Sequence, residues 1–189
     1  TACAGRPGGG CSEKQQLMPL QKDTPVLVLA SSSATRHALL QRAGLAFEAL
    51  PAAVDEAALK EACQAEKIPA EDAAIILAEA KAERIARRVP DALVIGGDQL
   101  LVCKMEDGTE RWFDKPADMA AARRQLLALR GKTHRLVTAT VAWRNGERIW
   151  QDVTTPRLTM RNFSDTFLDA YLAAEGEAPA GFVLLGLAA

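Results

Sequence analysis

The sequence predicts an α/β protein built around a mixed β-sheet. Short apolar runs rich in β-branched residues alternate along the chain with segments of helical periodicity, a pattern typical of α/β folds. Two tight-turn signals, Asp107-Gly108 and Asn145-Gly146, each lie between strand-like segments and predict hairpins. Because crossover helices join parallel strands and hairpins join antiparallel ones, both kinds of pairing are expected in one sheet.

Five elements are predicted in the first half of the chain. In order they are a strand at 26–30, a helix at about 35–43, an extended stretch at 46–54, a short helix at about 57–66 and a long helix at about 70–88. Gly44 supplies a C-terminal cap for the first helix, and Pro90 stops the long one. Leu39, Leu40 and Ala43 share one face of the first helix, which predicts that this face packs on the core.

The second half predicts further strands and two more helices. They are a strand at 92–95 that breaks at Gly96-Gly97 and resumes at 100–102, a helix at about 117–129 closed by Gly131, paired strands at 135–143 and 148–161, and a final helix at 164–174. No internal repeat interrupts this order.

Composition excludes several classes of function. A chain of 189 residues is long enough for one domain with its own core. Its formal net charge of −1 argues against a nucleic-acid partner, and no apolar run approaches the length of a membrane span. Four scattered cysteines form no zinc or disulfide pattern, so we expect a reduced, cytoplasmic protein in which Cys63 and Cys103 are packing residues.

The first 24 residues differ from the rest. They are rich in glycine and polar residues and lack apolar periodicity, which predicts a disordered N-terminal extension over 1–24 and a single domain over 25–189. They also lack the apolar core of a secretory signal. We hypothesise that Met18 is the natural start of the protein.

A serine-rich junction is the first candidate binding site. The strand at 26–30 stops at Ser31, Ser32 and Ser33, and Arg36 lies in the first turn of the following helix. Unpaired backbone N–H groups at a helix start, together with hydroxyls and a guanidinium, favour an anion such as phosphate. The simpler alternative is that Ser33 is an N-cap and Arg36 a solvated residue.

Charged residues at other junctions are candidates for chemistry. Asp98 lies between two apolar strand segments, where a carboxylate is costly unless it is exposed or binds a cation. Glu56 follows Asp55 at a strand-to-helix junction, Lys81 lies in the long helix, and Lys115 precedes a proline. Each has a plainer interpretation, as a turn aspartate, a first-turn acid or a solvated lysine.

Taken together, these residues suit metal-assisted phosphate chemistry. Asp98 and Glu56 are hard oxygen ligands of the kind that Mg²⁺ or Mn²⁺ prefers, while the serines, the arginine and the two lysines could hold a triphosphate. The sequence has no Gly-x-x-x-x-Gly-Lys-Ser/Thr motif, which excludes an ordinary P-loop. Attack of a metal-activated water on phosphorus is the reaction that this set best supports.

At this point the sequence resembles a known family, the Maf nucleoside triphosphate pyrophosphatases. The motifs that carry the resemblance follow the family's order and spacing over about 26–175. They are Leu29-Ala-Ser-Ser-Ser-Ala-Thr-Arg36 with Leu39-Leu40, Val54-Asp55-Glu56, Ala80-Lys81-Ala82, Gly96-Gly97-Asp98-Gln99, Lys115-Pro116, Leu129-Arg-Gly-Lys-Thr-His134 and Tyr171-Leu172.

The resemblance implies a two-lobed α/β fold around a central cleft. It also implies a cytoplasmic, homodimeric, metal-dependent house-cleaning enzyme of nucleotide metabolism that cleaves a nucleoside triphosphate to the monophosphate and pyrophosphate. Carried onto this chain, the implied substrate-binding residues are Ser31, Ser33, Arg36, Lys81 and Gln99. Asp98 and Glu56 would be both catalytic and metal-binding, and Lys115 would be catalytic.

The serine loop departs from the family's usual pattern. The family usually has Ser-Pro-Arg-Arg where this chain has Ser33-Ala34-Thr35-Arg36. A residue other than arginine at position 35, with Gln99 after the aspartate, resembles the branch that acts on 7-methyl-GTP. Another modified or pyrimidine nucleotide is the alternative substrate.

The C-terminal motif is a second departure. Residues 180–186 keep the frame of a family segment but lack its polar glutamine or glutamate, and the chain ends at Ala189. We therefore expect the family's C-terminal segment to be missing. Together with the altered serine loop, this leaves a second hypothesis open: a nucleotide-binding regulatory protein whose catalysis is weak or lost.

Overall fold

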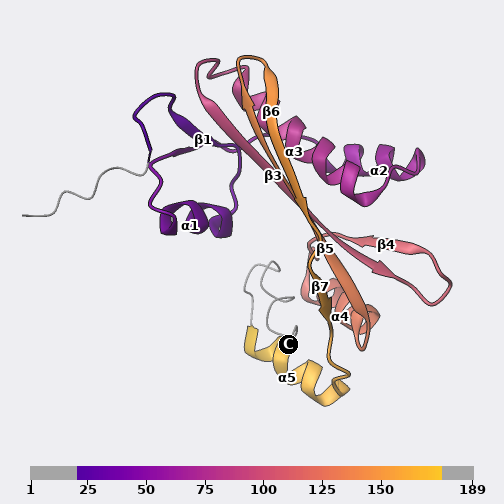
Figure 1. Ribbon diagram of the computed structural model, residues 1–189. Helices are drawn as coiled ribbons and strands as arrows, with labels where there is room; N and C mark the ends of the chain where they lie inside the picture. Colours follow the sequence, from indigo (N-terminus) through magenta and orange to yellow (C-terminus); the bar gives the residue numbers. More distant parts are fainter. Residues whose placement is uncertain (1–20, 176–189) are drawn as a thin grey trace, which may run out of the picture.

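A seven-stranded mixed sheet organises the computed structural model, which describes residues 21–175 (Figure 1). The elements in order are β1 (Leu27–Leu29), α1 (Ala34–Arg42), β2 (Glu48–Ala49), α2 (Glu56–Ala65), α3 (Ala70–Ala86), β3 (Leu93–Lys104), β4 (Glu110–Phe113), α4 (Met119–Leu129), β5 (Thr133–Arg144), β6 (Glu147–Thr154), β7 (Arg157–Thr159) and α5 (Asp165–Glu175).

Parallel and antiparallel pairs share the one sheet, as the sequence predicts. The main strand order is β2-β1-β3-β5-β6, with β4 paired to β3 and β7 paired to β5. β1 runs parallel to β2 and β3, and every other pair is antiparallel. The turn between β5 and β6 holds Asn145 and Gly146 at φ 54° and 83°, the left-handed values that this hairpin signal requires.

Strand β3 is continuous, so the predicted break at Gly96-Gly97 is wrong. Its pairing with β5 runs without a shift from Val94 opposite Trp143 to Cys103 opposite His134. Glycine weakens a strand by entropy but still donates and accepts ladder hydrogen bonds, so pairing with the long strand β5 keeps β3 regular through Gly96 and Gly97. The single predicted strand at 148–161 is also wrong, because it divides into β6 and β7, which pair with different parts of β5.

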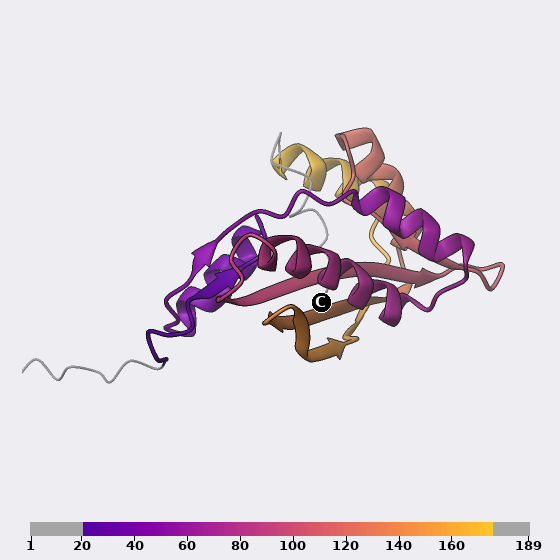
Figure 2. The same cartoon turned by 90° about the horizontal axis from the view of Figure 1, so that it is seen from above.

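The uninterrupted pairing means that alternate residues of β3 face opposite sides of the sheet. Val94, Leu100 and Val102 belong to a hydrophobic cluster with α3, and Figure 2 shows α3 lying along this strand. Leu101 and Cys103 belong to a second cluster with α4 and α5. Two clusters on a shared long strand agree with the two-lobed arrangement that the resemblance implies.

One side of β3 lacks a neighbouring strand over its middle. On that side β1 pairs with residues 93–95 and β4 with residues 101–104, so among the described residues no strand pairs with Gly96 to Leu100 there. β5 alone pairs with this stretch. The sheet is therefore open at Asp98, at the point where β1 ends and leads towards α1.

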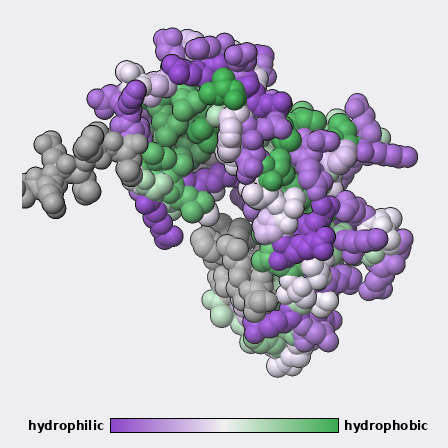
Figure 3. Space-filling model, in the orientation of Figure 1, coloured by the Kyte–Doolittle hydropathy of each residue, from purple (hydrophilic) through white to green (hydrophobic). Residues whose placement is uncertain are grey.

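Helix α1 differs from its prediction. Gly44 has φ 72°, and the N–H groups of Gly44 and Leu45 bond back to Gln41 and Leu40, which confirms the predicted glycine cap. However, no residue of α1 is buried, and Leu39 is 59% exposed, so the predicted core-facing side is wrong. Figure 3 shows apolar surface around β1 and α1.

The remaining sequence predictions have mixed outcomes. Cys63 and Cys103 are buried packing residues, and desolvation raises the pKa of both thiols. Within 21–175 no helix is long and apolar enough to cross a membrane. Gln21 already exchanges two hydrogen bonds with the backbone of Ala46, so ordered contacts begin inside the predicted extension. Met18 and the motif at 180–186 lie outside the described residues.

Candidate active site

Lys81, Asp98 and Glu56 form an ion cluster that joins three elements. The Lys81 ammonium on α3 donates to Asp98 Oδ1 on β3 at 2.6 Å and lies 2.9 Å from Glu56 Oε1 at the start of α2. Lys81 and Asp98 are only 8% and 4% exposed, whereas the Glu56 side chain is 43% exposed. The plainer interpretations, a solvated lysine and a surface turn aspartate, are therefore wrong.

Close packing of α3 on β3 brings the cluster together. Gly96 precedes Asp98 by two residues and so lies on the same face of the strand. A Cβ atom at Gly96 would lie 2.3 Å from the Ala78 carbonyl oxygen and 2.8 Å from the Ala82 Cβ, so only glycine permits this approach. Small residues on α3 and the missing side chain on β3 thus let Lys81 reach Asp98.

The N-cap of α2 positions Glu56, the third residue of the ion cluster. Asp55 caps α2 by accepting a hydrogen bond from the Ala58 N–H at 3.0 Å, and Glu56 is the first helical residue. An acidic residue is favourable in the first turn, because the helix dipole is positive there. The cap therefore fixes where α2 begins and where the Glu56 carboxylate lies.

The charge of the cluster favours a further cation. One ammonium faces two carboxylates, so negative charge remains uncompensated. Asp98 Oδ2 is buried and has no hydrogen-bond partner among the described residues, an expensive state for a carboxylate oxygen. Mg²⁺ is commonly held by one or two carboxylates together with substrate phosphates, so this donor set fits the expected Mg²⁺ or Mn²⁺. No group of three or more His, Cys, Asp or Glu side chains that could hold a metal occurs within 21–175.

The serine loop forms a second group of site residues. Ser33 caps α1, and its Oγ accepts from the Arg36 N–H at 3.4 Å, which confirms the N-cap interpretation. Ser31 Oγ accepts from the Arg36 guanidinium at 3.4 Å and from the Ser33 N–H at 3.1 Å. The Arg36 side chain crosses β3 at Gly97, where a Cβ atom would lie 3.2 Å from its Nε.

Gln99 belongs to this second group rather than to the first. It is exposed and lies on the Gly97 face of β3, and its Nε2 donates to Thr138 Oγ1 on β5 at 2.7 Å. The sequence suggested one cluster of site residues, but strand alternation divides them between the two faces of the sheet. Both groups flank the stretch of β3 from Gly96 to Leu100 that, among the described residues, has a neighbouring strand on one side only, and a ligand there could reach both groups.

Lys115 lies on a loop that is tied to α2. Lys115 is exposed and makes no ion pair within 21–175, but the preceding Asp114 accepts a hydrogen bond from the Lys60 ammonium at 2.5 Å. Lys60 lies one turn after Glu56 on α2. Sequence reasoning missed Lys60, although its i+4 spacing from Glu56 places both on one side of the helix.

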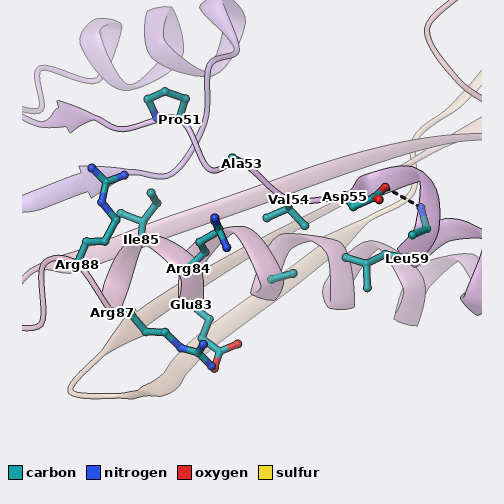
Figure 4. Close-up of a pocket in the computed structure, with 12 residues that line it drawn as sticks. Pro51, Ala53, Val54, Asp55, Leu59, Glu83, Arg84, Ile85, Arg87 and Arg88 are labelled. Atoms are coloured by element: carbon teal, nitrogen blue, oxygen red, sulfur yellow. Dashed lines mark hydrogen bonds and ion pairs between the residues drawn. The ribbon is translucent and has the colours of Figure 1, made fainter.

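A groove of about 880 Å³ lies beside the ion cluster but contains none of the predicted site residues. Figure 4 shows Asp55 and Val54 at its α2 end and Arg84, Arg87 and Arg88 at the C-terminal end of α3. Arg87 pairs with Glu83 at 2.6 Å. The groove is open and is not lined by Lys81 or Asp98, so these buried charges mark the candidate site better than the groove does.

Comparison with known proteins agrees with the motifs. The family model described as "Maf-like protein" matches residues 26–186. This chain belongs to the Maf family. A relative from Granulibacter bethesdensis named "Nucleoside triphosphate pyrophosphatase" is 50% identical over 157 residues, covering 83% of this chain and 77% of the relative.

Two further Maf relatives carry different names. A "Nucleoside triphosphate pyrophosphatase" from Paramagnetospirillum magneticum is 53% identical over 151 residues, covering 80% of this chain and 75% of the relative. A "7-methyl-GTP pyrophosphatase" from Rhizobium meliloti is 48% identical over 153 residues, covering 81% of this chain and 74% of the relative. Among Maf proteins, similarity to this chain thus extends to relatives of both names.

Proposed function

We propose that this Maf protein is a metal-dependent nucleoside triphosphate pyrophosphatase. The observation that carries the proposal is the buried Lys81–Asp98 pair with Glu56 beside it, placed where the sheet is open. Two desolvated charges with an unpartnered carboxylate oxygen are costly to maintain for stability alone. The names of the curated relatives support the same activity.

In the proposed reaction a water molecule attacks the α-phosphorus of the nucleotide. The bond between the α-phosphorus and the oxygen bridging to the β-phosphate breaks, so pyrophosphate leaves and the nucleoside monophosphate remains. Asp98 accepts the proton of the attacking water, in the role of general base. A divalent cation held by Asp98 and Glu56 would supply Lewis-acid stabilisation of the phosphoryl oxygens.

The cationic side chains bind and orient the triphosphate. Arg36, held against Ser31 at the start of α1, offers a guanidinium and nearby backbone N–H groups to phosphate oxygens. Lys81 approaches from α3 and Lys115 from the loop tied to Lys60. Their charges offset the charge that develops on the leaving pyrophosphate.

For the base, we propose 7-methyl-GTP or a similarly modified nucleotide. Gln99 donates its amide N–H to Thr138, which leaves its carbonyl oxygen available to accept a hydrogen bond from a nucleobase. The relative from Rhizobium meliloti bears a name that includes this substrate. A pyrimidine triphosphate is the alternative substrate, and the kcat/KM values on the two kinds of nucleotide distinguish them.

The test is an assay of pyrophosphate release over a panel of canonical and methylated nucleoside triphosphates with Mg²⁺ or Mn²⁺. Release of pyrophosphate with the monophosphate, and the highest kcat/KM on 7-methyl-GTP, would support the proposal. Tight nucleotide binding without release would favour the second hypothesis, a nucleotide-binding regulatory protein, whose support is the altered loop at Ala34 and Thr35.

A further inference from the structure

The Lys81 ammonium lies between the two carboxylates that the proposed function assigns to the metal. It contacts Asp98 Oδ1 at 2.6 Å and Glu56 Oε1 at 2.9 Å, so one oxygen of each carboxylate already binds a cation. A divalent ion that bridged Asp98 and Glu56 would compete for these same oxygens. It would also lie within a few ångströms of a buried positive charge, which repels it strongly in a medium of low dielectric constant.

The cluster has one direction in which the lysine can move. Lys81 and Asp98 are buried, whereas the Glu56 side chain is 43% exposed, so the cluster opens to solvent on the Glu56 side. A lysine carries its charge on a flexible four-carbon stem and can follow a new anionic partner without a backbone shift. The phosphates of a nucleotide are such a partner.

We propose that Lys81 is an internal cation that couples metal binding to nucleotide binding. Without nucleotide, Lys81 neutralises Asp98 and Glu56 and keeps the affinity for a divalent ion low. When a triphosphate arrives, its oxygens attract the ammonium away and complete the coordination of the ion, so nucleotide and metal strengthen each other's binding. This inference rests on the proposed function, and it assigns Lys81 a role beyond holding phosphate.

Lys60 offers a matched control. It is a partly buried lysine on the helix that carries Glu56, and it forms an ion pair with Asp114 rather than with the cluster. Its replacement removes one positive charge from the same region. The carboxylates of Asp98 and Glu56 keep their ammonium in that variant.

The experiment measures Mn²⁺ binding by electron paramagnetic resonance in Lys81→Met, Lys60→Met and the unsubstituted protein, with and without a non-hydrolysable α,β-methylene triphosphate. We expect Lys81→Met to bind Mn²⁺ at least tenfold more tightly than the unsubstituted protein when no nucleotide is present. We also expect the analogue to strengthen Mn²⁺ binding in the unsubstituted protein and in Lys60→Met, but much less in Lys81→Met.

Equal or weaker Mn²⁺ binding by nucleotide-free Lys81→Met would overturn the coupling role and leave the proposed function standing. Absence of Mn²⁺ binding by the unsubstituted protein with the analogue present would instead overturn the metal dependence on which both rest. If Lys81→Met does not fold, the ¹⁵N signal of the Lys81 ammonium, identified by its loss in Lys81→Arg, carries the test. That signal should move when Mg²⁺ and the analogue are added together, and an unchanged signal would overturn the proposal.

Discussion

Replacing Gly96 with alanine tests the packing that assembles the ion cluster. The added Cβ would lie 2.3 Å from the Ala78 carbonyl oxygen, about 1 Å closer than the 3.4 Å at which ordinary contact begins. Because the obstructing atom belongs to the backbone of α3, no side-chain rotation relieves the overlap. The helix must move away from β3 by about 1 Å, so Lys81 keeps its 2.6 Å contact with Asp98 only by changing the conformation of its stem.

The expected cost of Gly96→Ala is about 1–3 kcal/mol of unfolding free energy, the usual range for overpacking a core. Gly97→Ala is the matched control, since its Cβ would meet the flexible Arg36 side chain at 3.2 Å and cost less than about 1 kcal/mol. Urea denaturation measures both free energies, and pyrophosphate release measures turnover. If Gly96→Ala were as stable as Gly97→Ala, the close packing of α3 on β3 that positions Lys81 would be refuted.

Two further predictions concern residues outside the ion cluster. Lys60→Met and Asp114→Asn should each lower kcat/KM by a similar factor, because either change frees the Lys115 loop from α2. The double variant should have the same kcat/KM as each single variant. If the two single losses in kcat/KM multiplied in the double variant, the Lys60–Asp114 pair would not be what holds the loop. His134 is buried, its Nδ1 has no hydrogen-bond partner within 21–175, and desolvation lowers its pKa from the ordinary 6.5. As the pH falls, the imidazole is therefore protonated in the unfolded chain before it is protonated in the folded protein. Stability should therefore fall as pH drops below about 6.5, and His134→Leu should show a shallower fall in thermal melts from pH 7 to 5; an unchanged slope would exclude His134 as the source.

The sequence predicted the order of most elements, because many of their boundaries have a local cause. Gly44 and Asn145-Gly146 adopt the left-handed backbone that their motifs require, and Asp118, immediately before α4, accepts a capping bond from the Ala121 N–H at 2.6 Å. The continuity of β3 through Gly96 could not be predicted from the local sequence. It depends on ten consecutive pairs with β5, which lies more than thirty residues away.

The sequence named the candidate site residues but did not give their arrangement. Asp98 and Gln99 are neighbours in sequence, yet strand alternation turns them to opposite faces, where they contact Lys81 and Thr138 respectively. Burial of Lys81 follows from the tertiary contact at Gly96, for which an alanine-rich helix gives no local signal. Lys60 was missed because its partner, Asp114, is 54 residues away along the chain.

Asp98→Asn tests whether the Asp98 carboxylate performs the chemistry. Asparagine preserves the shape of the side chain but removes its charge and its capacity to accept a proton. We predict a loss of about 10²–10⁴-fold in pyrophosphate release, while binding of the α,β-methylene analogue partly survives through Arg36 and Lys115. Turnover near that of the unsubstituted protein would contradict the account.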